Sequence, residues 1–154
     1  HNADQYLFLE KLAIELSPLF SELKKKHDIR IIAEPGTFLV NNTGALIVKI
    51  FDIIERNNKK WIFIDNGIMQ GFPWVLSKIR YEIHYPYKTE KNIKNYNYII
   101  AGPTNDSKDI FGEFVLPENI KINDFLIIYP AGAYTNSSVC YNGYRIPEIK
   151  FAKY

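Results

Sequence analysis

Five short polar segments, each beside an apolar run, contain the residues of this chain that could do chemistry. They are AEPG (33–36), IDNG (64–67), AGPTNDSKD (101–109), AGAYT (131–135) and CYNGY (140–144). Each segment has a glycine, which lets the backbone turn sharply or approach a ligand closely. A turn between strands explains any one of them, so a functional site has to be argued from the set.

Three of the segments hold side chains suited to binding charged groups. Glu34 follows the apolar run IRIIA, and the carboxyl end of a strand is where catalytic side chains gather in parallel α/β barrels. Asp106 and Asp109 follow a Gly-Pro pair, an arrangement that could bind an ammonium group. Tyr134 follows a strand and a glycine, and a buried tyrosine hydroxyl needs a partner such as a phosphate oxygen. A polar loop or a turn remains an alternative for each.

Other chemistries have less support in the sequence. It contains no Walker lysine loop, no GxGxxG after a strand and no CxxC, and its three histidines lack metal-ligand spacing. A nucleophilic pair of Cys140 with a histidine stays open on composition alone. An OB-like nucleic-acid barrel also stays open, although a net charge of +2 argues against it. We therefore expect no metal and no nucleic-acid partner.

The composition also indicates where the protein works. Cys140 is the single cysteine, which excludes an internal disulfide and fits a reducing compartment. No apolar stretch approaches the roughly 20 residues that span a bilayer, and the N-terminus lacks a signal pattern. We expect a cytoplasmic protein with no membrane partner.

Hydrophobic periodicity predicts the elements that must position these segments. Leucines recur with a mostly helical period and predict a helix over 4–26, interrupted at Ser17-Pro18. A short buried strand is expected at 29–33. From residue 37 onward the pattern predicts a run of strands, with a turn near 56–58 and further strands around 74–87, 95–102, 111–116, 124–132 and 145–154.

This element order predicts a mainly β fold. We expect a C-terminal β-barrel or sandwich domain over 41–154, preceded over 1–40 by the last helix and strand of an incomplete α/β (TIM-like) barrel. A lone helix and strand have no sheet of their own, which indicates that the chain begins inside a larger fold.

In this order, the five segments resemble the C-terminal half of the fold-type III pyridoxal-phosphate decarboxylases, the ornithine, arginine and diaminopimelate decarboxylase family. IIAEPGTFLV is similar to that family's EPGR segment, WIFIDNGIMQGF to its NDG segment and GPTNDSKD to its GPTCDxxD segment. GAYT and CYNGY are similar to its GAYT and FNGF segments. The resemblance covers residues 20–154 and leans toward the ornithine decarboxylase branch.

The resemblance implies a binding site for pyridoxal 5'-phosphate. Glu34 matches the carboxylate that pairs with the pyridinium nitrogen of the cofactor. Gly36 and Thr37 match the loop whose backbone amides hold the cofactor phosphate, and Tyr134 matches a tyrosine that hydrogen-bonds the same phosphate. The family has an arginine where this chain has Thr37, so one cationic phosphate contact is lost here.

The resemblance also implies substrate contacts. Asp106 matches an acidic residue that reaches across a dimer interface to the distal amine of the substrate, and Tyr141 matches an aromatic residue at the mouth of the active site. Asn105 stands where the family has a cysteine that helps protonate the product carbon. Counting from IDNG places Lys78 at an acidic substrate contact, and a lysine there favours a carboxylate or phosphate on the substrate.

These matches predict a carboxy-lyase that acts on a basic amino acid or an aminoacyl-type substrate as a homodimer with shared active sites. A natural-product tailoring enzyme is a sub-hypothesis, because the diamine-binding pattern is altered. The family's Schiff-base lysine lies in a barrel region absent here, so we expect this chain to be inactive without the missing N-terminal barrel portion. The alternatives are a non-catalytic homologue that acts as a binding or regulatory module, one subunit of a split enzyme, and a stand-alone β-barrel binding protein.

Overall fold

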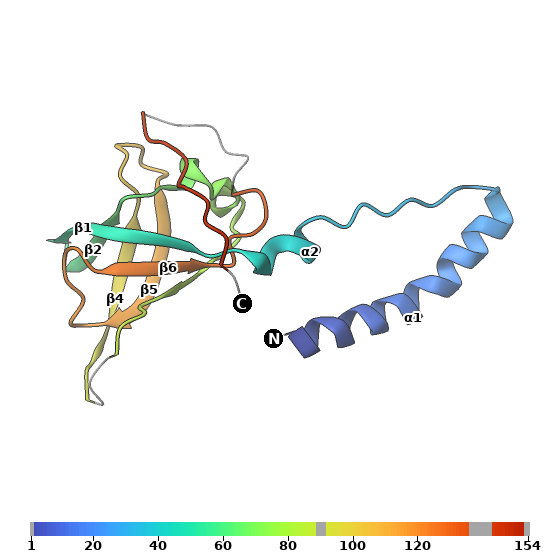
Figure 1. The fold of residues 1–154 in the computed structure, drawn as a ribbon, viewed down its shortest axis with the longest axis horizontal. Helices are drawn as coiled ribbons and strands as arrows, with labels where there is room; N and C mark the ends of the chain where they lie inside the picture. Colours follow the sequence, from blue (N-terminus) through green and yellow to red (C-terminus); the bar gives the residue numbers. More distant parts are fainter. Residues whose placement is uncertain (1, 89–91, 136–142, 153–154) are drawn as a thin grey trace. The chain divides into compact units, whose positions relative to one another are not determined.

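The chain folds into two compact units, His1–Pro35 and Gly36–Tyr154. The structure, a computed structural model, describes residues 2–88, 92–135 and 143–152 (Figure 1). The division between the units precedes the boundary that we predicted after residue 40. Our assignment of residues 1–40 to a barrel remnant stays a prediction.

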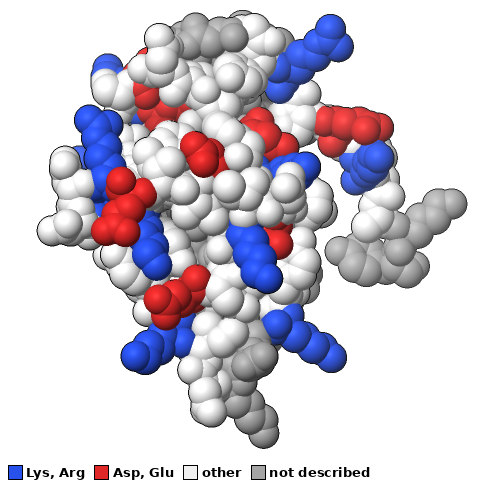
Figure 2. Space-filling view, turned by 90° about the vertical axis from the view of Figure 1, so that its left-hand side faces the viewer, with Lys and Arg blue, Asp and Glu red and all other residues white. Residues whose placement is uncertain are grey.

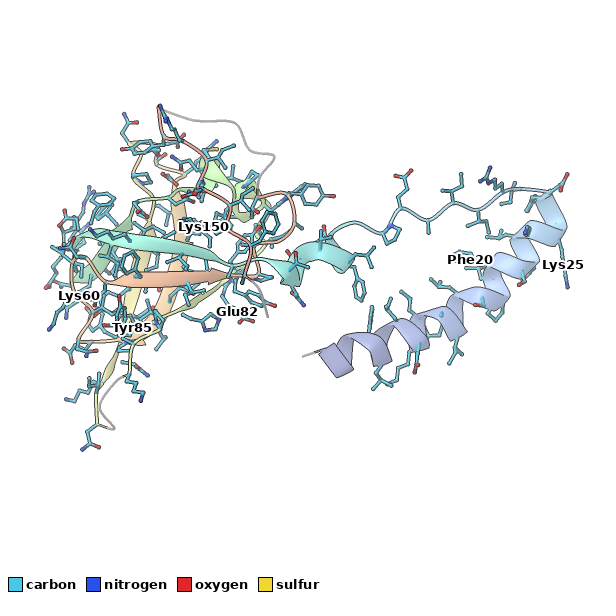
Figure 3. The ribbon with its side chains drawn as sticks, in the orientation of Figure 1. Phe20, Lys25, Lys60, Glu82, Tyr85 and Lys150 are labelled. Carbon is cyan, nitrogen blue, oxygen red and sulfur yellow. The ribbon has the colours of Figure 1, made fainter. Side chains whose placement is uncertain are left out.

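The first unit is built on one helix, α1 (Asn2–His27), as the leucine periodicity predicted. Pro18 lies inside the helix without ending it, and the hydroxyl of Ser17 donates a hydrogen bond to the carbonyl of Ala13 (2.6 Å). Within its unit, α1 leaves apolar side chains exposed, and Figure 3 shows Phe20 and Lys25 extending from it.

The strand that we predicted after α1 does not form in this structure. Residues 29–35 have no strand assignment, and Ile29, Ile31 and Ile32 are exposed. A strand is stabilised by hydrogen bonds to a neighbouring strand, and the described part of this unit offers none. The apolar pattern therefore identified a segment suited to a sheet but not the sheet itself.

The second unit is a six-stranded, nearly closed, barrel-like sheet (Figure 1). Its strands are β1 (Leu46–Arg56), β2 (Lys59–Ile64), β3 (Glu82–His84), β4 (Asn95–Ala101), β5 (Ile110–Pro117) and β6 (Phe125–Tyr129). They pair in the order β3-β6-β1-β2-β4-β5, antiparallel except for the parallel pair β2 and β4. The predicted mainly β fold is confirmed.

Alternation along the strands places one set of side chains inside the barrel. Successive strand residues point to opposite faces, so every second residue can be buried. Four strands contribute such pairs to the core: Val48 and Ile50, Ile62 and Ile64, Tyr98 and Ile100, and Leu126 and Ile128.

Short helical turns replace two stretches that we expected to be strands, 37–43 and 74–77, and a further turn follows β2. Residues 37–43 form α2 (Thr37–Val40) and the 3-10 turn η1 (Asn41–Thr43), and the following strand begins only at Leu46. A second 3-10 turn, η2 (Ile68–Gln70), follows β2. A third, η3 (Pro73–Ser77), begins at a proline, whose fixed φ suits the first position of a helical turn. Residues 145–152 are irregular, and Pro147 removes a donor that a strand would need.

Charged side chains of both signs are interspersed on the face of the molecule drawn in Figure 2. In the described part of the chain, no helix is long and apolar enough to cross a membrane. Nor do the described residues bring together three or more His, Cys, Asp or Glu side chains that could hold a metal ion.

Candidate functional site

The AGAYT segment is held against the turn that follows AEPG. The amide of Ala131 donates to the carbonyl of Gly44 (2.7 Å), and the amide of Gly132 donates to the carbonyl of Asn41 (2.8 Å). A methyl group at Gly132 would overlap the carbonyl oxygen of Val40. Only glycine allows this approach, so the segment after β6 is fixed directly beside α2 and η1.

Tyr134 lies at the centre of this contact. A Cβ atom placed on Gly36 would lie 3.4 Å from the Tyr134 hydroxyl, so the glycine of AEPG and the tyrosine of AGAYT are neighbours. The Tyr134 ring packs edge-to-face on Trp74 of η3, with 5.4 Å between ring centroids. Tyr134 has a left-handed backbone (φ 63°) and is half exposed.

These segments enclose a cavity of about 220 Å³ in the second unit. The residues that line it come from α2 and η1, from η3 and the segment after it, and from the segment after β6: Thr37, Asn41, Trp74, Ile79, Arg80, Tyr81, Pro130, Ala133 and Tyr134. Burial raises the pKa of Tyr81, so this hydroxyl stays protonated at neutral pH. The cavity therefore combines aromatic walls with hydroxyl donors and one guanidinium group.

Asp109 holds the GPTNDSKD loop to the rest of the site. Its side chain is 2% exposed. The carboxylate accepts hydrogen bonds from the amide of Ile68 (2.7 Å) and from the amide and hydroxyl of Thr104 (3.1 and 2.7 Å). We predicted that Asp106 and Asp109 could bind an ammonium group together, and this is wrong for Asp109. Its carboxylate is turned inward, where backbone donors occupy it.

Two glycines make room for this buried carboxylate. A Cβ atom on Gly67 would lie 2.6 Å from the Asp109 oxygens, and a Cβ on Gly102 would overlap the same group. Gly71, with φ +143°, lies against the carbonyl oxygen of Thr135. The IDNG segment and the residues after it therefore contact both the GPTNDSKD loop and the AGAYT segment.

Asp106 lies in the same loop with a different environment. It is half-buried, its Oδ1 atom accepts a hydrogen bond from the amide of Lys108 (2.8 Å), and its carbonyl accepts one from the amide of Asp109 (2.9 Å). Asn105, beside it, is exposed. These bonds fix the backbone of the loop, while the substrate role of Asp106 stays a prediction.

The remaining predicted residues are spread over both units. Glu34 belongs to the first unit and is exposed. Lys78 ends η3 with a left-handed backbone (φ 64°), and its side chain is exposed. Tyr141 lies outside the described residues. From the same segment, the Tyr144 hydroxyl donates to the carbonyl of Pro103 (3.1 Å), which brings Tyr144 to the GPTNDSKD loop.

Sequence reasoning missed several residues of the site. Arg80 and Trp74 line the cavity, although each stands in a stretch that we expected to be a plain strand. Gln70 is buried, and neither polar atom of its side chain has a partner among the described residues. A glutamine between apolar residues in GIMQGF was the only available signal. Asp65, by contrast, accepts a hydrogen bond from the amide of Lys49 in β1 (2.8 Å), so its carboxylate is bonded to the backbone of a strand.

The lining of the cavity fits a phosphate monoester. Thr37 and Tyr134 carry hydroxyl donors, Gly36 leaves room for a close approach beside Tyr134, and Arg80 supplies a positive charge. Charge-assisted hydrogen bonds from such groups are the strongest that proteins make to phosphate oxygens.

The sequence was next compared with models of known protein families. Residues 37–132 match the model of the pyridoxal-dependent decarboxylase C-terminal sheet domain. The chain belongs to this family. The matched residues include the whole barrel-like sheet and both Thr37 and Arg80 of the cavity.

Relatives of the chain are decarboxylases of several basic amino acids. It is 34% identical over 140 residues to a diaminopimelate decarboxylase of Buchnera aphidicola, a match covering 80% of this chain and 32% of the relative. It is 24% identical over 135 residues to the ornithine decarboxylase of Schizosaccharomyces pombe, covering 80% and 31%. The chain therefore spans about a third of the length of these relatives.

Solved structures of the family share the fold. The arginine decarboxylase of Paramecium bursaria Chlorella virus superposes with a TM-score of 0.74 at 22% identity, over 84% of this chain and 36% of that one. A mutant diaminopimelate decarboxylase of Helicobacter pylori, complexed with L-lysine, gives a TM-score of 0.66 at 27% identity, over 79% and 30%. In both, the similarity is confined to about a third of the solved chain.

Proposed function

We propose that this chain is the C-terminal part of a pyridoxal-phosphate-dependent decarboxylase of a basic amino acid or an aminoacyl-type substrate. The observation that carries the proposal is that Thr37 and Tyr134 line one cavity, with Gly36 beside the Tyr134 hydroxyl, in a member of this family. The relatives are decarboxylases of diaminopimelate and ornithine, which supports a substrate with a distal amine.

The residues of this chain would hold and tune the cofactor. Bound pyridoxal phosphate supplies an electron sink for the charge left on the substrate carbon when carbon dioxide departs. Glu34 would keep the ring nitrogen protonated, since a carboxylate favours the charged form of a neighbouring base. Gly36 and Thr37 would donate backbone amides to the phosphate, and Tyr134 would donate its hydroxyl.

Substrate selection would fall to other residues. Asp106 would bind a distal ammonium group of the substrate in the other subunit of a homodimer, and Tyr141 would line the mouth of that site. Lys78 would favour substrates that carry an anionic group, because it repels a simple diamine. Asn105 has no acidic proton, so it cannot protonate the product carbon as a cysteine thiol at this position would. These departures support a specialised biosynthetic decarboxylase, such as one that tailors a natural product.

The activity would belong to a longer protein. The chain covers about a third of its relatives, and the missing N-terminal barrel portion would supply the rest of the cofactor site. We propose a cytoplasmic homodimer with shared active sites, a proposal that fits the single cysteine. Sedimentation of the complete protein with and without cofactor measures its oligomeric state, and a monomer in both conditions would exclude shared sites.

The deciding experiment uses the complete protein that contains this chain. Pyridoxal phosphate is added and its absorbance followed, and carbon dioxide release is then measured with lysine, ornithine, arginine and diaminopimelate. We expect the absorbance band of the cofactor to shift and carbon dioxide to be released from a substrate of this class. If no cofactor band forms, the catalytic proposal is wrong. Efficient release of carbon dioxide from free ornithine would exclude only the sub-hypothesis of a natural-product tailoring enzyme.

A second candidate, a non-catalytic binding or regulatory homologue, is favoured by Asn105 at the position of the family's cysteine. It predicts that the complete protein binds cofactor yet releases no carbon dioxide from any substrate, including aminoacyl conjugates. The split-enzyme alternative predicts instead that this chain co-purifies with a separate barrel polypeptide.

A further inference from the structure

Arg80 introduces a positive charge into the cavity at a position that the sequence motifs do not mark. It is the one cationic side chain among the described residues that line the cavity, and none of those residues carries a carboxylate. No ion pair within the described ranges of the chain involves Arg80. Its guanidinium group is therefore not neutralised by a described acidic side chain, and the cavity attracts anions.

The backbone around Arg80 fixes where this arginine lies. Before it, η3 ends at the left-handed Lys78, and the amide of Ile79 donates back to the carbonyl of Trp74 (3.2 Å). After it, Tyr81 is 8% exposed and packs edge-to-face on Phe72, with 4.8 Å between ring centroids. The backbone of Arg80 is therefore held between a capped turn and a buried ring, and its exposed side chain lines the cavity.

The partners of Arg80 in the lining identify the anion. Thr37 and Tyr134 contribute hydroxyl groups to the same cavity, and Gly36 adjoins the Tyr134 hydroxyl. A guanidinium group with neighbouring hydroxyl donors suits a tetrahedral phosphate, to which arginine donates two parallel hydrogen bonds. The volume of about 220 Å³ is below that of a typical complete ligand site, so it suits one end of a ligand.

We propose that Arg80 is the residue that binds the cofactor phosphate electrostatically in this protein, in place of the arginine that the family has at the position of Thr37. This inference rests on the proposed function. It explains how a chain with a neutral residue after AEPG can still compensate the phosphate charge. The two positions, 37 and 80, line the same cavity although they are far apart in the sequence.

The test compares pyridoxal phosphate with pyridoxal, which lacks the phosphate. Both are titrated into the complete protein, wild type and Arg80→Gln, and binding is followed by tryptophan fluorescence and cofactor absorbance. We expect Arg80→Gln to weaken pyridoxal phosphate binding about 10- to 100-fold, the range for a charged hydrogen-bonding partner, and to leave pyridoxal binding unchanged. Arg56→Gln, at the exposed end of β1, is the matched control and should change neither.

A second variant tests directly whether an arginine at position 37 can replace Arg80. Thr37→Arg in the Arg80→Gln background should restore most of the affinity for pyridoxal phosphate, because it returns a guanidinium group to the same cavity. Unfolding midpoints of all variants establish that each one is folded. Failure of Thr37→Arg to restore affinity would contradict the proposed equivalence of the two positions.

The other outcomes separate this inference from the proposed function. If the wild-type protein binds no pyridoxal phosphate, both are wrong. If the wild type binds it and Arg80→Gln binds it equally well, only the role of Arg80 is wrong. Equal losses for pyridoxal and pyridoxal phosphate would show that Arg80 acts on the ring or the fold. A raised KM for substrate with unchanged cofactor affinity would assign Arg80 to the substrate carboxylate, and either result overturns the inference.

Discussion

Asp109 joins two loops of the candidate site through one buried carboxylate. It accepts hydrogen bonds from Ile68 in η2 and from Thr104 in the GPTNDSKD loop, and both elements must hold their positions to make these bonds. A carboxylate that is buried and accepts backbone hydrogen bonds is expensive to remove, because its donors are left without partners. The role of this aspartate is therefore to position the loop that carries Asp106.

We predict that Asp109→Ala lowers the free energy of unfolding by about 3–5 kcal/mol, since it leaves two amides and one hydroxyl unpaired in a buried place. Asp109→Asn conserves the shape and should still cost about 2 kcal/mol, because its amide group would face donors at Thr104. Urea unfolding of the complete protein measures both. Glu55→Ala, on an exposed strand position, is the control and should change stability by less than about 0.5 kcal/mol. A small effect of both Asp109 variants would contradict the positioning role.

Tyr85 gives the second unit a stability that depends on pH. Its hydroxyl donates to the Asp124 carboxylate (2.8 Å), and desolvation, followed by this hydrogen bond and the charge of Asp124, raises the pKa of Tyr85 to about 12. The unfolded chain loses this proton near pH 10, whereas the folded chain keeps it until about pH 12. Tyr85 therefore contributes its full stabilisation below pH 10, and this stabilisation is lost as the pH rises from 10 to about 12.

We predict that wild-type stability falls more steeply between pH 10 and 12 than that of Tyr85→Phe. The full shift would correspond to about 2.7 kcal/mol, but Tyr85 is only half-buried, and solvent screening reduces the expected difference to about 1 kcal/mol. Unfolding curves at several pH values measure it. Burial also raises the pKa values of Tyr81 and Tyr98 in both proteins, so the comparison isolates Tyr85. Parallel pH profiles for the two proteins would exclude this role.

At the scale of elements, the hairpin of β1 and β2 shows what local sequence can specify. Asn57 and Asn58 form the turn with φ values of 53° and 58°, the left-handed pair that a two-residue hairpin turn requires. Asparagine tolerates this conformation better than residues other than glycine. The turn was predictable because its chemistry lies within two residues and the strands on either side alternate.

We predict that Asn58→Gly leaves stability unchanged or raises it by up to about 0.5 kcal/mol, because glycine is the preferred residue at the second position of this turn. Asn58→Ala should lower stability by about 1 kcal/mol, the cost of a left-handed backbone for an alanine. Thermal unfolding of the two variants measures the difference. Equal stability of the Gly and Ala variants would contradict the left-handed turn.

Elements that depend on distant partners were predicted less well. Residues 29–33 have a strand pattern, yet they form no strand, because the pattern does not supply the neighbour that a strand needs. Thr37–Val40 is apolar enough for a strand but is helical, and the carbonyl of its last residue, Val40, lies against Gly132 in the segment after β6. Of the residues that line the cavity, the motifs named Thr37 and Tyr134 in advance, while Arg80 was missed because nothing local in the sequence distinguishes it from a surface arginine.

At the scale of the whole molecule, the two compact units differ in how well they bury their apolar residues. The barrel has a continuous core, with several side chains such as Ile50, Ile62 and Leu126 completely buried. In α1, Phe8, Ile14 and Leu19 each keep about half or more of their surface exposed. Exposed apolar surface of this kind is typical of a segment that is covered by other parts of a protein, which fits a chain that spans about a third of its relatives.

We predict that removing residues 1–35 leaves the unfolding of the barrel unchanged and lowers the binding of an apolar fluorescent dye. The barrel has its own core, whereas the exposed apolar side chains of α1 are the sites that such a dye would bind. Both tryptophans, Trp61 and Trp74, lie in the second unit, so their fluorescence in urea reports only the barrel. The two chains, 1–154 and 36–154, should give the same midpoint. A lower midpoint for 36–154 would mean that residues 1–35 stabilise the barrel, and the division into two independent units would then be wrong.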